Sequence, residues 1–148
     1  MKEKHMPDIV VVGVDGSETA TKAAETARNL AAALGAKLHV VTAFEGDRVS
    51  LHGAGSERAI VFGDPGREAK ETASKVAAGL QQEGVEIEAF SAVGNPAQAL
   101  IAHAENHNAS VIVVGNRRMK GLARVLGSVA NTVAHKAPCD VYIADTVE

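Results

Sequence analysis

Two short runs of β-branched residues, IVVVGV at 9–14 and SVIVV at 110–114, are apolar almost without interruption. A strand with one face in water alternates apolar and polar residues, so these runs predict strands that are buried on both faces. Strands of this kind occur in parallel sheets that are covered by helices on both sides. Each run ends in a glycine-bearing turn, at 13–17 and 115–118. If the two strands are neighbours, both turns lie at one edge of the sheet, where ligands of such folds bind.

Helical and strand patterns alternate along the rest of the chain. Apolar residues at helical spacing, with start signals such as Ser17, Asp64-Pro65 and Asn95-Pro96, predict four helices. Alternating strands and helices specify an α/β fold, a doubly wound, open, parallel five-stranded sheet with right-handed crossovers. The stretch 45–63 contains glycines and has little periodicity, which is typical of a long functional or disordered loop. The predicted strands cover 8–14, 37–43, 85–93, 110–114 and 139–144, and the predicted helices cover 17–34, 64–84, 95–107 and 128–136.

Length and composition restrict the possible classes of protein. A chain of 148 residues with 46% apolar content suits one domain, which we place at 8–146 after a frayed segment at 1–7. A net charge of -3 and an aromatic content of 3% argue against nucleic-acid partners. No apolar stretch approaches 18 residues and the chain has one cysteine. We therefore expect a cytoplasmic protein without membrane or nucleic-acid partners.

The segment GNRRMKGLARVLGS at 115–128 concentrates positive charge. It contains no acidic residue, and it ends with Gly127 and Ser128 at a predicted helix start. Unpaired backbone N–H groups and the positive end of the helix dipole make such a start suitable for a phosphate. Alternatively, the cations form a solvated loop and Ser128 is an ordinary N-cap. The cations of this segment are Arg117, Arg118, Lys120 and Arg124.

Three segments, GVDGS at 13–17, VVGNRRMKGLARVLGS at 113–128 and APCDVYIA at 137–144, resemble those of universal stress proteins. The resemblance covers residues 8–146 and implies an adenine nucleotide alpha hydrolase-like fold with strand order 3-2-1-4-5. It also implies a stress-response regulatory or signalling module that binds an adenine nucleotide, ATP before others, with or without Mg²⁺. Asp15 would hold the ribose hydroxyls or a metal-bridged phosphate. The remaining residues that the resemblance implies at the site are Gly13, Val14, Val40, Val41, Val114, Gly115, Arg117, Arg118, Gly127, Ser128 and Val129.

The glycine pattern of the nucleotide-binding members is modified here. That pattern reads Gly, two residues, Gly, nine residues, Gly and Ser or Thr. Arg118 occupies the place of the second glycine, and eight residues separate it from Gly127. Arginine can pair with phosphate through its planar fork of donors, or it can fill the site. AMP, cyclic AMP and a nucleotide-free, dimeric interaction module therefore remain as alternatives to ATP.

Several other residues suggest chemistry, but each has a structural explanation. Asp15 could cap the helix that follows, yet Ser17 can do this instead, which favours a binding role for Asp15. His103 and His107 have the spacing of a two-histidine metal clip, but no third ligand is evident in the sequence, so we assign them to the surface. Cys139 is expected to be a packed thiol. No nucleophile and base are paired in the sequence, so we expect no enzyme, at most slow ATP hydrolysis or autophosphorylation.

The last predicted strand, 139–144, is short and is expected at a sheet edge. An exposed edge carries unpaired backbone groups that natural proteins usually cover. The resemblance implies that a second copy of the chain covers this edge. We therefore expect a homodimer through Cys139 to Ala144, with further protein partners unknown.

Overall fold

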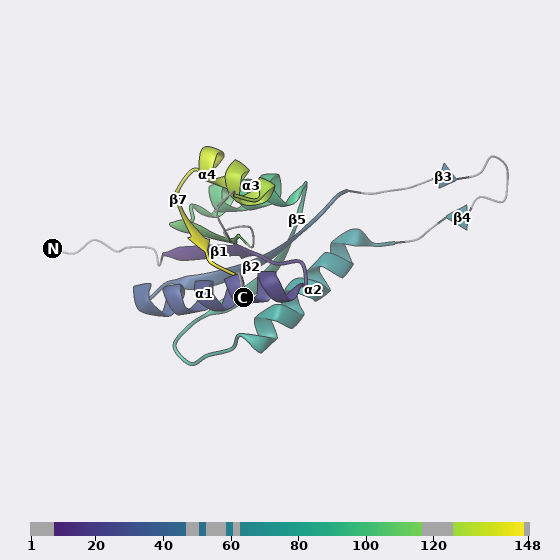
Figure 1. Ribbon diagram of the computed structural model, residues 1–148. Coiled ribbons are helices and arrows are strands. Elements are labelled where there is room, and N and C mark those ends of the chain that lie inside the picture. The colour runs from purple at the N-terminus through teal and green to yellow at the C-terminus, as the bar shows by residue number, and fades with distance from the viewer. Residues whose placement is uncertain (1–7, 47–50, 53–58, 61–62, 117–125, 147–148) are drawn as a thin grey trace.

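The computed structural model describes residues 8–46, 51–52, 59–60, 63–116 and 126–146 (Figure 1). A five-stranded parallel sheet forms the centre, in the order β5-β2-β1-β6-β7. This order confirms the predicted arrangement 3-2-1-4-5. The strands of the sheet are β1 (Ile9–Gly13), β2 (Lys37–Phe44), β5 (Ile87–Val93), β6 (Val111–Gly115) and β7 (Asp140–Ala144).

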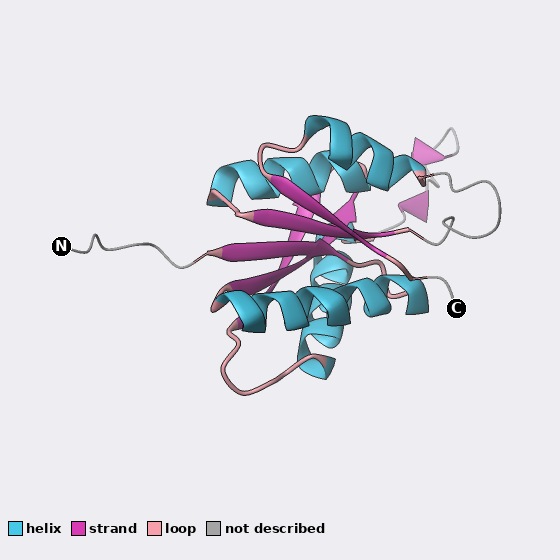
Figure 2. Ribbon diagram, turned by 60° about the vertical axis from the view of Figure 1, so that its left-hand side comes forward, coloured by secondary structure: helices cyan, strands magenta, loops and turns pink. Residues whose placement is uncertain are grey.

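Helices cover both faces of the sheet, as Figure 2 shows. One face carries α1 (Glu18–Leu34) and α2 (Pro65–Gly79), and the other carries α3 (Pro96–His107) and α4 (Ser128–Lys136). Successive residues of β1 divide between these layers, because side chains alternate along a strand. Val10 and Val12 pack under α1, whereas Val11 packs under α3 and α4. All three are fully buried, which explains the uninterrupted apolar run in the sequence.

Local signals set the helix boundaries. The Ser17 side chain accepts a hydrogen bond from the Ala20 N–H at the start of α1, and Gly35 ends that helix with φ of 67°. Asn95 and Gln98 form the predicted capping box of α3. Asp64 caps α2 through the Arg67 N–H. Each of these side chains satisfies a backbone donor that would otherwise have no partner inside its helix.

The structure differs most from the prediction at two places. α2 ends at Gly79 with Leu80 as its C-cap, earlier than the predicted 84, and the chain turns through Gly84 at φ of 89° before it enters β5. Within the long stretch 45–63, Leu51–His52 (β3) and Ala59–Ile60 (β4) form a two-stranded antiparallel pair. The predicted frayed segment 1–7 lies outside the described residues. None of the described helices has the length and apolar character needed to cross a membrane.

Candidate functional site

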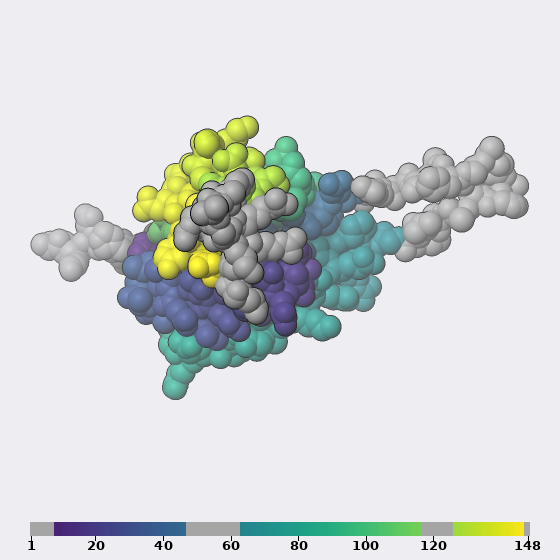
Figure 3. Space-filling model, in the orientation of Figure 1, coloured from purple at the N-terminus to yellow at the C-terminus, as the bar shows by residue number. Residues whose placement is uncertain are grey.

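A cleft of about 940 Å³ opens at the carboxyl ends of β1 and β6. These two strands are neighbours in the sheet, so the described parts of the two glycine-bearing turns, 13–17 and 115–116, lie together. The chain after β1 leads to α1 on one face of the sheet, and the chain after β6 leads to α4 on the other face. Connections that diverge in this way create the crevice typical of doubly wound sheets. In Figure 3 the surface of α4 (yellow) lies above that of α1 (purple to blue). The predicted site residues that line the cleft are Gly13, Val14, Asp15, Val41, Val114, Gly115, Gly127, Ser128 and Val129.

Asp15 lies at the turn between β1 and α1. Its Oδ1 accepts a hydrogen bond from the Ser17 N–H at 2.9 Å, while Ser17 itself caps α1. The carboxylate is exposed and lines the cleft. Asp15 therefore stabilises the turn by this hydrogen bond, while the N-cap of α1 is Ser17 and not Asp15. Among the described residues that line the cleft, Asp15 is the only titratable one.

The opposite wall is the start of α4. Gly127 is the N-cap, and its N–H donates to the Asn116 Oδ1 at 3.0 Å. Ser128 is therefore the first helical residue and not the N-cap, which leaves its exposed hydroxyl at the cleft. The first intrahelical bond runs from the Asn131 N–H to the Gly127 carbonyl. The preceding N–H groups have no partner inside the helix, so this wall presents backbone donors and the positive end of the dipole.

Apolar side chains of β2 and α3 complete the cleft. Val41, Ala43, Pro96 and Leu100 line it. A Cβ atom added at Gly13 would lie 2.9 Å from Leu100 Cδ1, so a larger residue at this point would have to displace the Leu100 side chain. The Val14 N–H donates to the Val41 carbonyl at 2.9 Å and ties the turn after β1 to β2. The cleft thus combines an apolar part, one carboxylate and a set of backbone donors.

Three predicted site residues are not part of the cleft as described. Val40 is fully buried beneath α1 and α2, because it alternates with Val41 and points to the other face of β2. The prediction could not separate these neighbours, since both belong to one apolar run. Arg117 and Arg118, together with Lys120 and Arg124 of the same segment, lie outside the described residues.

The sequence interpretation missed Asn116, Pro96 and Leu100. Asn116 directly follows β6, is 2% exposed and holds Gly127, eleven residues later, by its side-chain oxygen. A short amide side chain next to a strand-end glycine was the available signal. Pro96 and Leu100 have ordinary helix-start and core positions in the sequence, and only the packing of α3 over β1 and β2 brings them to the cleft.

The assignment of His103 to the surface was wrong. His103 is 6% exposed, and its Nε2 lies 2.9 Å from the Nδ1 of the buried His39. His39 comes from β2 and supplies the third histidine that the sequence did not reveal. Burial, then the neighbouring His107 and His39, lower the pKa of His103 to about 3. Cys139 is half-buried against the core under α4, and burial first and Asp140 second raise the pKa of its thiol, consistent with a packed role.

Comparisons with known proteins identify the family. The model of the universal stress protein family matches residues 6–145. A universal stress protein of Methanocaldococcus jannaschii is 32% identical over 138 residues, which span 90% of this chain and 79% of that protein. A crystal structure of a universal stress protein in complex with cAMP matches with a TM-score of 0.65 and 34% identity, covering 94% of this chain and 97% of the other.

A further solved structure is that of the Archaeoglobus fulgidus universal stress protein in complex with dAMP. It has a TM-score of 0.67 and 28% identity, and the match covers 93% of this chain and 97% of that one. These matches extend over nearly the whole chain, including both turns of the cleft. The chain belongs to the universal stress protein family.

Proposed function

We propose that this universal stress protein binds an adenine nucleotide in the cleft between β1 and β6. The observation that carries the proposal is the convergence of two strand-end glycine turns on the start of α4, in a cleft of about 940 Å³. Cleft volumes of this size suit small ligands and cofactors. The complexes of two relatives, one with cAMP and one with dAMP, support the adenine class of ligand.

Different parts of the cleft suit the base, the ribose and the phosphates of a nucleotide. Val14, Val41 and Leu100 offer an apolar surface for the base. The Asp15 carboxylate accepts hydrogen bonds from the ribose hydroxyls. The first turn of α4, from Ser128, offers N–H groups and a hydroxyl to the phosphates, and Gly115 and Gly127 let the phosphates approach the backbone.

The proposed role is regulatory, with nucleotide occupancy as the signal. A binding role is supported by the chemistry of the cleft, whose described residues offer an apolar surface, one carboxylate and the backbone donors at the start of α4. ATP, the first choice from the sequence resemblance, and the monophosphates AMP and cyclic AMP are the candidate ligands.

Isothermal titration of nucleotide-stripped protein tests this function. The parent is titrated with ATP-Mg²⁺, AMP and cyclic AMP, and so is Asp15→Asn. Asparagine keeps the oxygen that accepts from the Ser17 N–H but removes the charge. We expect affinity to fall roughly 10- to 100-fold, because a hydrogen bond to a charged group contributes about 1.5–3 kcal/mol.

Gly127→Ala tests the phosphate wall separately. At Gly127 an added Cβ would meet only Asn116 Oδ1 at 3.6 Å, an ordinary contact, so the protein itself accepts alanine. We expect the variant to fold normally and to bind nucleotides more weakly. Gly79→Ala, at a helix position with open space around it, is the matched control and should bind like the parent. If the parent binds none of the three nucleotides, the proposal fails and a nucleotide-free interaction module is the better account.

A further inference from the structure

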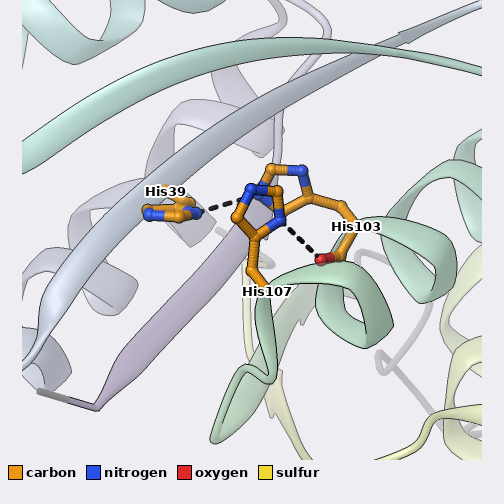
Figure 4. Close-up of side chains that lie close together, drawn as sticks. All are labelled: His39, His103 and His107. Carbon is orange, nitrogen blue, oxygen red and sulfur yellow. Dashed lines mark hydrogen bonds between the residues drawn. The ribbon is translucent and has the colours of Figure 1, made fainter. Parts of the chain in front are cut away.

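Three histidines converge away from the nucleotide cleft, between β2 and α3. Figure 4 shows His39 from β2 facing His103 and His107, which lie one turn apart on α3. One ring nitrogen from each lies within 4.8 Å of the other two. His39 is 4% and His103 6% exposed, while His107 closes the cluster at its outer side. None of the three lines the cleft, which contacts the opposite end of α3 through Pro96 and Leu100.

The hydrogen bonds of the cluster determine which ring nitrogen of His107 is available as a ligand. His107 Nδ1 lies 2.9 Å from the backbone carbonyl oxygen of His103, which can only accept, so Nδ1 carries the proton. In the neutral ring, Nε2 of His107 is then unprotonated. A ring N–H donated to a backbone carbonyl is the usual outer-shell support of a metal-binding histidine, since it fixes the tautomer and the ring orientation.

Nδ1 of His39 and Nε2 of His103 lie 2.9 Å apart, so one neutral ring donates a hydrogen bond to the other. A metal ion can take the place of this proton when the donor ring carries its proton on its other nitrogen, so that both facing nitrogens offer a lone pair. Zinc–nitrogen bonds of about 2.0–2.1 Å at tetrahedral angles place two nitrogens roughly 3.3 Å apart. The pair needs to separate by only a few tenths of an ångström, and the ring of His107 needs to move inward from the rim.

Metal ligation requires unprotonated ring nitrogens, and burial of the two inner rings, His39 and His103, disfavours their charged form. Burial first, and the charge of His107 next, lower the pKa of His39, and burial does the same for His103. Glu88 lies beside His39 in the β2–β5 ladder and has the opposite electrostatic effect on it. This exposed carboxylate offsets part of the charge of a bound cation.

The alternative explanation is that the three histidines only pack with one another and with Phe90 as part of the core. Phe90 lies with its ring centroid 4.5 Å from that of His39 and 4.6 Å from that of His103, and the rings of His103 and His107 stack at 4.0 Å. Apolar residues would fill such a space without burying ring nitrogens, however. Three imidazoles that each have a ring nitrogen within 4.8 Å of the other two indicate a ligand set more than a core.

We propose that His39, His103 and His107 bind one divalent transition-metal ion, with zinc as the expected metal and water as a fourth ligand. Neutral imidazoles suit zinc, copper, nickel and iron and disfavour magnesium or calcium. Three histidines with an open fourth position form a known zinc geometry. The site is independent of the nucleotide cleft, and its test does not require a nucleotide.

The test uses full-length protein without a histidine tag, stripped of metal with a chelator that is then removed. Titration with zinc chloride should show one site per chain, and Co²⁺ should give the visible absorption of a tetrahedral centre. His107→Gln should lose at least about tenfold in zinc affinity, since even outer-shell partners contribute 10–100-fold. This residue lies at the rim, so the variant should fold, which circular dichroism checks.

His135→Gln is the matched control, because His135 is an exposed histidine near the end of α4. It should bind zinc like the parent. His103→Gln, which removes the central ring, should abolish the site and the cobalt spectrum. The proposal is overturned if the folded parent binds no zinc at micromolar concentration, if His107→Gln binds as tightly as the parent, or if His135→Gln loses affinity equally.

Discussion

Gly13 and Gly115 end neighbouring strands, and the space beside each is already filled. A Cβ atom on Gly115 would lie 3.0 Å from Thr146 Cγ2 and 3.3 Å from Ala23 Cβ. An added side chain would therefore require Thr146 or Ala23, which pack over the strand end, to move. Gly13 and Gly115 both line the cleft.

Gly115→Ala tests this packing. We expect a loss of about 1–3 kcal/mol in the free energy of unfolding, because the added methyl group overpacks a filled site. Urea denaturation monitored by circular dichroism measures it. Gly79→Ala, which meets no atom within 4 Å, is the control and should be neutral or stabilising. Equal stability of Gly115→Ala and the parent would show that Thr146 moves aside without cost.

At the residue scale, the sequence could indicate the glycine turns but not the orientation of single side chains. Val40 and Val41 both belong to one buried apolar run. Side chains alternate between the two faces of a strand, and only the structure shows that Val41 is the one that faces the cleft. His39 is 64 residues from His103 in sequence, so no local pattern could join them. The contact of Asn116 with Gly127 is likewise a product of the fold.

Among the elements, α3 has the most complete cap. At its start the Gln98 N–H donates a hydrogen bond to the Asn95 side chain at 2.9 Å. In return, the Asn95 N–H donates to the Gln98 side chain at 3.3 Å. These reciprocal bonds were predicted, because a capping box depends on residues only three positions apart. The end of α2 was predicted less well, because Gly79 and Gly84 are both plausible stops and tertiary contacts decide between them.

Asn95→Ala should destabilise the protein by about 1 kcal/mol, the usual cost of losing an N-cap side chain. Chemical denaturation is the measurement. Asn106→Ala, on the exposed side of the same helix, controls for the substitution itself and should be neutral or slightly stabilising, since alanine favours helix. If both variants lose the same amount of stability, the capping box is not the cause.

The whole molecule is a sheet with helices on both faces and with β5 and β7 at its two edges. β7 ends the strand order, and the Tyr142 side chain on it is 45% exposed. The strand order was predicted from the family resemblance, whereas the sequence pattern itself indicated only two strands buried on both faces and a short last strand at an edge. The pairing of β3 with β4 could not be predicted, since two-residue strands leave no periodicity.

We predict a homodimer through β7. Light scattering at micromolar concentration should give twice the chain mass of 15.3 kDa. Tyr142→Lys should shift the protein towards the monomer, because it places a charge on both sides of the paired edge. Leu34→Lys changes an apolar residue of similar exposure, 49%, at the end of α1 and should remain dimeric. A parent that elutes and scatters as a monomer would contradict the prediction.

β2 contributes to both proposed sites from one face, through His39 and, two residues later, Val41. A slip of this strand by one residue would turn both side chains towards α1 and α2, since the pleat has a period of two. A chain trapped in that state would bind neither ligand. The number of binding sites measured per chain therefore reports the fraction of correctly folded molecules in a preparation. If the numbers of metal sites and nucleotide sites both fall below one per chain by the same amount, the missing fraction is the misregistered one.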